Sequence, residues 1–283
     1  MSLSGNLTGM VELITVGPGF ELKDVDPSST PGVTKGKKWG EQKLREGAAE
    51  LLDLQEKLYA GSLAGDTRNV LLILQAMDTA GKGGIVNHVM GAMDPQGVSL
   101  FAFKAPTDEE KHHDFLWRVR KRLPKAGMVG VFDRSHYEDV LIHRVRGFST
   151  PEAIEERYGL ITAFEQELVA SGTTVIRVML HIGKDEQKER LLARLDDPAK
   201  HWKFNPGDID ERERWDAYQE AYQVALTRTS VPDAAWSVIP ADHKWYARLA
   251  VQQLLLDALR AMHLEWPVAE YDVDKQRERL LAT

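Results

Sequence analysis

The chain has 283 residues, 43% of them apolar, and a net charge of −7 at pH 7, which fits one large globular domain with or without an insertion. It contains no cysteine, so disulfides and thiolate metal sites are excluded. No run approaches the roughly 20 apolar residues of a membrane span, and the first residues lack a secretory pattern. We therefore expect a cytoplasmic protein without a membrane partner.

The first 39 residues are rich in Gly, Pro, Ser and Thr, as in VGPGF and DPSSTPG. This composition predicts an irregular arm that wraps the surface, ahead of one domain over residues 40–283. Leucines at helical spacing predict a helix over about 40–60. The lysines at the end of the arm are interpreted as a solvated loop, with contact to a phosphate chain as the alternative.

Residues 69–87, NVLLILQAMDTAGKGGIVN, contain a buried apolar strand, a glycine-rich turn and the start of a helix. This context favours a P-loop over an ordinary turn with a chance Gly-Lys. Backbone N–H groups of such a loop bind anionic oxygens, and Lys82 would add a point charge. The predicted phosphate-binding loop residues are Ala80, Gly81, Gly83 and Gly84.

The loop departs from the usual G-x-x-x-x-G-K-[ST] pattern at two positions. Ala76 replaces the first glycine, and Gly83 replaces the hydroxyl residue that normally binds magnesium. Asp78 is the expected substitute because a carboxylate suits a hard cation. A role for Asp78 as a base, or in holding the loop, stays open.

A second strand is predicted over residues 98–104, and a capping box at Thr107 predicts a following helix. In this helix Arg118, Lys121 and Arg122 would share one face, three and four residues apart. Because ligands of open α/β sheets gather near strand ends, we predict that Lys104, Arg118 and Arg122 bind phosphate. A solvated basic face is the alternative.

A third strand, residues 127–132, ends in Asp133-Arg134. An apolar strand that delivers an acidic residue is typical of the second P-loop element, which binds magnesium directly or through water. Arg134 is interpreted as a clamp on a transferring phosphoryl group in preference to a salt bridge. Arg144 would add a further basic side chain to the lining of the phosphate site.

Two further strands are predicted over residues 174–182 and 236–240, with helices over 150–171 and from 244 to about 262. Five strands that alternate with helices predict a parallel sheet. The insertion at about 184–230 would form a helical lid that closes over phosphates and excludes water. Its predicted ligands are Arg190, Arg194 and Lys203; pairing of Arg190 with Glu186 and of Arg194 with Asp197 is the alternative.

Three segments together resemble the polyphosphate kinase 2 family: AMDTAGKGG at 76–84, DRSHYEDV at 133–140, and the lid from 185 to 203, which ends in DPAKHWK. The resemblance implies a thymidylate-kinase-like three-layer α/β/α sandwich with a helical lid. It also implies reversible transfer of the terminal phosphoryl of inorganic polyphosphate to a nucleotide, with Mg²⁺ or alternatively Mn²⁺, in a homo-oligomer (dimer or tetramer). The motif Ser-His-Tyr-Glu-Asp is similar to the motif of the subgroup that phosphorylates both AMP and ADP.

By motif position, the family's catalytic set corresponds to Asp78, Lys82, Asp133, Arg134 and Arg194, with Asp78 and Asp133 as metal ligands. Two alternatives stay open: an ATP-dependent nucleoside or nucleotide kinase of the same fold, and a non-catalytic nucleotide- or polyphosphate-binding regulator. Nucleic acid is not an expected partner because the basic residues gather around a predicted cleft and the net charge is negative.

Overall fold

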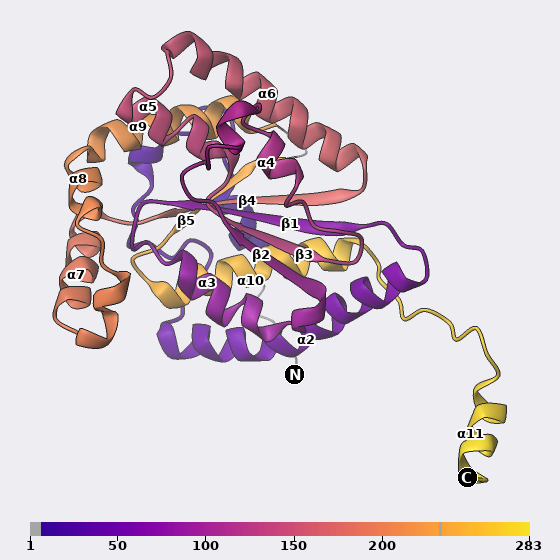
Figure 1. Cartoon of the computed structure of the whole chain (residues 1–283). Helices are drawn as coiled ribbons and strands as arrows, with labels where there is room; N and C mark the ends of the chain where they lie inside the picture. Colours follow the sequence, from indigo (N-terminus) through magenta and orange to yellow (C-terminus); the bar gives the residue numbers. More distant parts are fainter. Residues whose placement is uncertain (1–6, 232–233) are drawn as a thin grey trace.

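A five-stranded parallel sheet in the order β2-β3-β1-β4-β5 forms the middle layer of the computed structural model (Figure 1). The structure describes residues 7–231 and 234–283. The strands are β1 (Asn69–Ala76), β2 (Val98–Ala102), β3 (Val129–Asp133), β4 (Thr173–His181) and β5 (Trp236–Pro240). The predicted parallel sheet is confirmed. Because β1 is the central strand, the loop that follows it lies at the middle of the carboxyl edge, where ligands of open α/β sheets bind.

Helices cover both faces of the sheet and form the outer layers (Figure 1). One face is covered by α2 (Lys37–Leu63), α3 (Lys82–His88) and α10 (Lys244–Ala261). The other is covered by α4 (Trp117–Arg120), α5 (Ile142–Arg146), α6 (Pro151–Ala170) and α9 (Trp215–Thr229). The three-layer α/β/α architecture is therefore confirmed.

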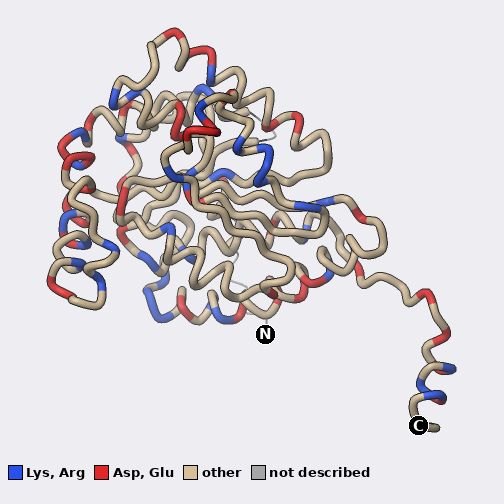
Figure 2. Tube along the Cα trace, in the orientation of Figure 1, with Lys and Arg blue, Asp and Glu red and all other residues tan. Residues whose placement is uncertain are grey.

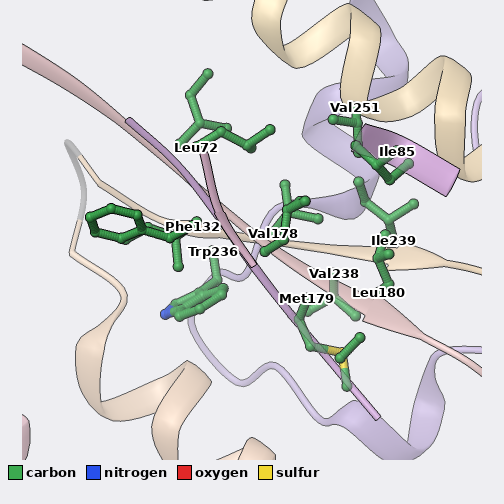
Figure 3. Close-up of a cluster of buried hydrophobic side chains, with 14 of the residues drawn as sticks. Leu72, Ile85, Phe132, Val178, Met179, Leu180, Trp236, Val238, Ile239 and Val251 are labelled. Atoms are coloured by element: carbon green, nitrogen blue, oxygen red, sulfur yellow. The ribbon is translucent and has the colours of Figure 1, made fainter. Parts of the chain in front are cut away.

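Burial on both faces explains why the strands consist of nearly continuous apolar runs. Every residue of β1 is buried. Figure 3 shows Leu180 and Ile239 on the side of the sheet that faces Ile85 of α3 and Val251 of α10, whereas Trp236 points to the opposite side. The core thus packs both helical layers onto one sheet and fixes the carboxyl ends of its strands.

The predicted lid segment contains α7 (Lys184–Leu195), α8 (Gly207–Glu213) and the start of α9, at one end of the sheet (Figure 1). Short 3₁₀ helices complete the described secondary structure. They are Leu22–Asp24, Met90–Ala92, Pro95–Gly97, Glu110–His112, His136–Asp139 and Pro198–Lys203. In the described part of the chain, no helix has both the length and the apolarity needed to cross a membrane.

Two local predictions are wrong. The N-terminal arm is not wholly irregular, because it contains α1 (Thr8–Ile14), which buries Met10 and Ile14 against the core. The continuous helix expected after Thr107 is replaced by a single 3₁₀ turn and the four-residue α4. The side chain of Asp114 accepts a hydrogen bond from the N–H of Leu116 (3.0 Å), a local bond of the kind that competes with helix formation.

The last described residues leave the body of the molecule after α10. They end in α11 (Val273–Leu281), which stands clear of the other elements in Figure 1.

Candidate active site

The loop after β1 has a backbone path suited to an anion. Thr79 and Gly81 have positive φ angles of 64° and 123°, and α3 begins immediately afterwards at Lys82. A Cβ atom added at Gly81 or Gly83 would meet no other atom within 4 Å. The loop therefore offers open space beside the N-terminus of α3, where N–H groups and the helix dipole favour negative charge.

Lys82 lies at the start of this helix and is only half-buried. Its Nζ donates to the carbonyl oxygen of Ala76 at 3.1 Å. The bond folds the lysine back along the loop, so that its ammonium group lies over the turn and near the predicted position of the phosphate.

Arg134 lies between the acidic groups of the site. Its Nη2 donates to Asp78 Oδ1 at 2.9 Å, and its Nη1 is 3.9 Å from Glu138 Oε2. Burial opposes the charge on Arg134, but Glu138 and Asp78 outweigh it and raise the pKa of the guanidinium. Arg134 also has a φ of 64°, an uncommon conformation for a bulky residue and one that clusters at functional sites.

Lid residues close one side of this site and form a polar pocket of about 180 Å³. The pocket is lined by Asp78, Arg134 and Glu138 together with Asp208, Glu211, Tyr218 and Tyr222 from the lid. Burial, and next to it the nearby Asp78, raises the pKa of Asp208. The pocket thus brings carboxylates close enough to repel one another, an arrangement that cationic or cation-bridged ligands stabilise.

Arg190 and Arg194 lie one turn apart on α7, but their contacts differ. Arg190 is buried and donates to four backbone carbonyls, those of Thr79, Ala80, Ala241 and Asp242, at 2.8 to 3.1 Å. Its Nε also donates to Glu186 at 2.7 Å, so the alternative pairing is confirmed. Arg194 contacts Asp208 Oδ2 at 3.4 Å and the carbonyl of Lys203 at 2.9 Å. The alternative pairing of Arg194 with Asp197 is wrong, because Asp197 pairs with Lys200.

A second pocket, of about 580 Å³, lies on the α2–α10 side of the P-loop. Its charged lining is mixed: the bases are Lys37, Lys244 and Arg248, the acids are Glu41, Glu186 and Asp242, and Lys37 Nζ lies 3.7 Å from Glu41 Oε1. The Arg248 guanidinium lies 3.5 Å from the position that a Cβ on Gly84 would occupy, so it adjoins the first turn of α3. Burial, followed by the charges of Arg190 and others, lowers the pKa of Lys244. The charge of Arg248 also contributes to this lowering, and a bound polyanion would offset the repulsion between Lys244 and Arg248.

Comparison with known proteins gives a family for this geometry. The sequence model of the family "Polyphosphate kinase 2 (PPK2)" matches residues 34–267. The chain belongs to the polyphosphate kinase 2 family. The motif-based prediction of the family is confirmed, and family membership makes the chain a phosphotransferase.

Two relatives and one structure illustrate the similarity of this polyphosphate kinase 2 chain to known proteins. It is 41% identical over 256 residues to the AMP/ADP-polyphosphate phosphotransferase of Meiothermus ruber, with 90% of this chain and 94% of that protein covered. It is 43% identical over 236 residues to the ADP-polyphosphate phosphotransferase of Rhodopseudomonas palustris, covering 79% and 80%. The crystal structure of polyphosphate kinase 2 from Arthrobacter aurescens TC1 shares 60% identity, with a TM-score of 0.94 and 96% of both chains covered.

The basic face predicted around Arg118 is not present in this polyphosphate kinase 2 chain. Arg118 is buried, donates to the carbonyl of Lys104 at 2.8 Å and lies 3.9 Å from Asp139. Arg122 instead covers the ring of Phe101 at 4.4 Å. The two arginines point to different surroundings because α4 ends at Arg120, before a second turn could align them. The side chain of Lys104 is exposed, outside the pocket beside Asp78.

Two other predicted ligands take part in surface contacts. Arg144 pairs with Glu220 of α9 at 2.7 Å. Lys203 is exposed, and its Nζ lies 4.9 Å from the ring centroid of Trp202. Neither lines the pocket beside Asp78, so the structure does not bring them together with Lys82 and Arg134.

Asp78 and Asp133 have the chemistry needed for a divalent cation. Asp133 ends β3, and Asp78 follows the neighbouring strand β1 by two residues. Within the described residues, no group of three or more His, Asp or Glu side chains forms a protein-only metal site. Mg²⁺ usually takes one or two carboxylates and completes its shell with water and substrate phosphates, so Asp78 and Asp133 match its ligand preference.

Sequence analysis missed Lys244 and Arg248. One signal was available: two cations occupy the first turns of α10, where the helix dipole disfavours positive charge. Sequence analysis also missed Glu138, Asp208 and Tyr222, because these residues line one pocket only where the lid packs over the P-loop.

Proposed function

We propose that this chain reversibly transfers the terminal phosphoryl group of inorganic polyphosphate to AMP or ADP. The observation that supports this function most directly is the position of the P-loop between two chemically different pockets. A pocket lined by Lys37, Lys244 and Arg248 together with three acids lies on the α10 side, and a carboxylate- and tyrosine-lined pocket lies under the lid. Such a pair suits a polyanionic donor and a nucleotide acceptor.

The donor would lie along Lys37, Lys244 and Arg248. Each cation can offset phosphate charge, and the half-buried position of Arg248 reduces the solvent screening of its attraction. The net charge of the whole chain is −7, so the chain as a whole does not attract a polyanion. A local concentration of cations is therefore what a long anionic chain requires.

The acceptor nucleotide would lie in the pocket under the lid. Leu141, Tyr218 and Tyr222 supply apolar and aromatic surface for a nucleoside. Arg134 supplies a guanidinium for the acceptor phosphate or the transferring group. The AMP/ADP acceptor range follows the name of the Meiothermus relative, an AMP/ADP-polyphosphate phosphotransferase, and the Ser-His-Tyr-Glu-Asp motif.

Catalysis in this proposal is positioning and charge compensation, without a covalent intermediate. Lys82 and the N–H groups around Gly81 and Gly83 would orient the transferring phosphoryl group. Arg134 would neutralise it from the acceptor side, and Arg194 would be carried by the lid. Asp78 and Asp133 would hold Mg²⁺, or Mn²⁺ in its place, which supplies positive charge to phosphate oxygens when bound.

The deciding experiment supplies ADP, Mg²⁺ and long-chain polyphosphate without ATP, and measures ATP formation. A parallel reaction with AMP measures ADP formation. We expect both products. Turnover only when ATP is the donor would instead identify a nucleotide kinase, and nucleotide or polyphosphate binding without turnover would identify a regulator.

The donor pocket can be tested separately with Lys244→Glu and Arg248→Glu. Each should raise the KM for polyphosphate by about tenfold or more, the equivalent of roughly 1.4 kcal/mol, with little change in the KM for ADP. Lys111→Ala is the matched control, because Lys111 is exposed and pairs only with Asp108. An unchanged polyphosphate KM in both charge-reversal variants would exclude this pocket as the donor site.

We also propose a cytoplasmic location, where the nucleotide substrates are available, and a homo-oligomeric state (dimer or tetramer). The segment after α10 supports the oligomer, because its apolar side chains lie uncovered.

A further inference from the structure

The segment after α10 is built differently from the rest of the molecule. Leu264 is the last buried residue, and the ring centroid of Trp266 lies 6.0 Å from Lys57 Nζ on α2. Beyond this point the chain runs away from the body and ends in α11 (Figure 1). Residues 265–283 are here called the C-terminal arm.

The C-terminal arm exposes many large apolar side chains for its length. Val268 is 90% exposed and Leu281 is 83% exposed. The exposed set is Trp266, Val268, Tyr271, Val273, Leu280 and Leu281. A group of this kind marks an interaction surface more often than isolated apolar residues do.

The helix of the arm also needs a support. α11 has nine residues, and isolated helices shorter than about 12–15 residues are only marginally stable in water. Asp272 caps it by accepting a hydrogen bond from the N–H of Lys275 at 3.0 Å, but a single cap adds only about 1 kcal/mol. Most helical stability in proteins comes from packing of an apolar face, and α11 has no buried residue in the described part of the chain.

A matching surface lies beside the edge strand β2. A cavity of about 570 Å³ is lined mainly by apolar side chains from the end of α2, β2 and residues 123–132. Leu63 and Leu100 in its lining are largely exposed. Among the described strands β2 lies at the edge of the sheet, beside β3, and exposed edge strands are surfaces that proteins usually cover.

The charges of the two surfaces are complementary over residues 265–272 of the arm, which carry three acids and no base, whereas α11 carries three bases and two acids. The cavity carries Lys121, Arg122 and Lys125. The arm carries five acids against three bases, and Figure 2 shows acidic residues along it and basic residues gathered in α11. The acids are Glu265, Glu270, Asp272, Asp274 and Glu278.

We propose that the C-terminal arm of one copy lies in the β2-side cavity of a second copy, and that the exchange is reciprocal. The arm leaves the body beside Lys57, and the cavity begins at Tyr59 of the same helix. A two-fold axis near the end of α2 therefore brings each arm over the other copy's cavity, as a self-complementary dimer requires. Each copy would contribute nineteen arm residues and fourteen cavity residues. This number is sufficient for the roughly 20–30 residues a side of a standard interface.

This proposal gives the homo-oligomer its contact surface and does not depend on the phosphotransfer proposal. The absence of native cysteine allows a direct test, because the pair Leu63→Cys and Leu281→Cys contains the only two thiols. Under mild oxidation we expect a disulfide-linked dimer on a non-reducing gel. Each single-cysteine variant should give much less of it.

A second measurement uses mass in solution. Full-length Leu280→Asp/Leu281→Asp should shift the oligomer toward smaller species by light scattering, whereas Leu160→Asp, an exposed leucine on α6, should not. Circular dichroism and turnover verify the fold of each variant. An oligomer of unchanged mass that gives no cross-link would overturn the arm exchange while leaving the homo-oligomer intact. A monomeric wild-type chain would overturn both.

Discussion

Replacement of Lys82 by alanine tests the role of this residue in catalysis separately from its role in stability. In the structure Lys82 makes one hydrogen bond, to the carbonyl of Ala76 at 3.1 Å, and is half-buried. Loss of one such bond costs about 0.5–1.5 kcal/mol, which for a domain of this size lowers Tm by only a few degrees, roughly 2–4 °C per kcal/mol. The native fold should therefore persist at assay temperature.

The effect on turnover should be much larger. A pre-positioned donor that contacts developing charge contributes about 2.7–4 kcal/mol to transition-state stabilisation, or roughly 10²–10³ in kcat. The same loss is expected for Lys82→Met, which keeps most of the apolar stem and so controls for packing. Lys111→Ala should retain wild-type turnover.

The assay measures kcat for ATP formation from ADP and polyphosphate, together with the thermal midpoint of each variant. Near-normal turnover by Lys82→Ala would remove the P-loop from the mechanism. A large decrease in the Tm of both Lys82 variants would instead show that the lysine stabilises the loop, more than its one side-chain hydrogen bond predicts.

Three further results are expected. Asp78→Asn should raise the Mg²⁺ concentration for half-maximal activity about tenfold, because an amide is a weaker ligand for a hard cation; an unchanged Mg²⁺ titration would exclude Asp78 as a ligand. Bound polyphosphate should raise the lowered pKa of Lys244, so binding is strongest below the free-state pKa and weakens as pH rises through it toward the ordinary value of 10.5. The polyphosphate KM should therefore increase as the pH rises toward 10.5, and less so in Lys244→Arg, whose charge persists; equal slopes would refute this. Arg177→Met leaves the buried Glu165 without its 2.8 Å partner and should lower the unfolding free energy by about 3–5 kcal/mol, measured by urea denaturation; a loss below about 1 kcal/mol would contradict it.

The sheet could be predicted from sequence because each strand is identified by a local pattern of residues. Buried parallel strands consist of short apolar runs, and the predicted 236–240 run coincides with β5. Asp78, Asp133 and Arg134 could be placed together for the same reason. They follow strands that turned out to be neighbours, and the carboxyl ends of parallel strands share one edge.

The failures arise where tertiary contacts override spacing. Arg118 has helical spacing to Arg122, but Glu110 and Asp139 draw it into the protein. No local pattern reveals those partners. The strand order was equally inaccessible, since it depends on which faces pack rather than on any single run.

The donor pocket was missed because its residues are distant in sequence. Lys37 and Lys244 are separated by more than two hundred residues, and only the packing of α2 along α10 joins them. Each alone resembles a solvated surface lysine. Their shared position in one pocket with Arg248 is a property of the fold.

The two arginines of α7 are held by different parts of the molecule. Arg190 donates to four carbonyls on the P-loop and the β5–α10 connection, so the first two turns of α7 are anchored to the body. Arg194 contacts only lid groups, Asp208 and the carbonyl of Lys203. Any opening of the lid that keeps the hydrogen bonds of Arg190 must therefore bend beyond it, carrying Arg194 with α8. Conformational changes of this kind concentrate at the ends of elements, and the anchored turns keep the P-loop in register whether the lid is open or closed.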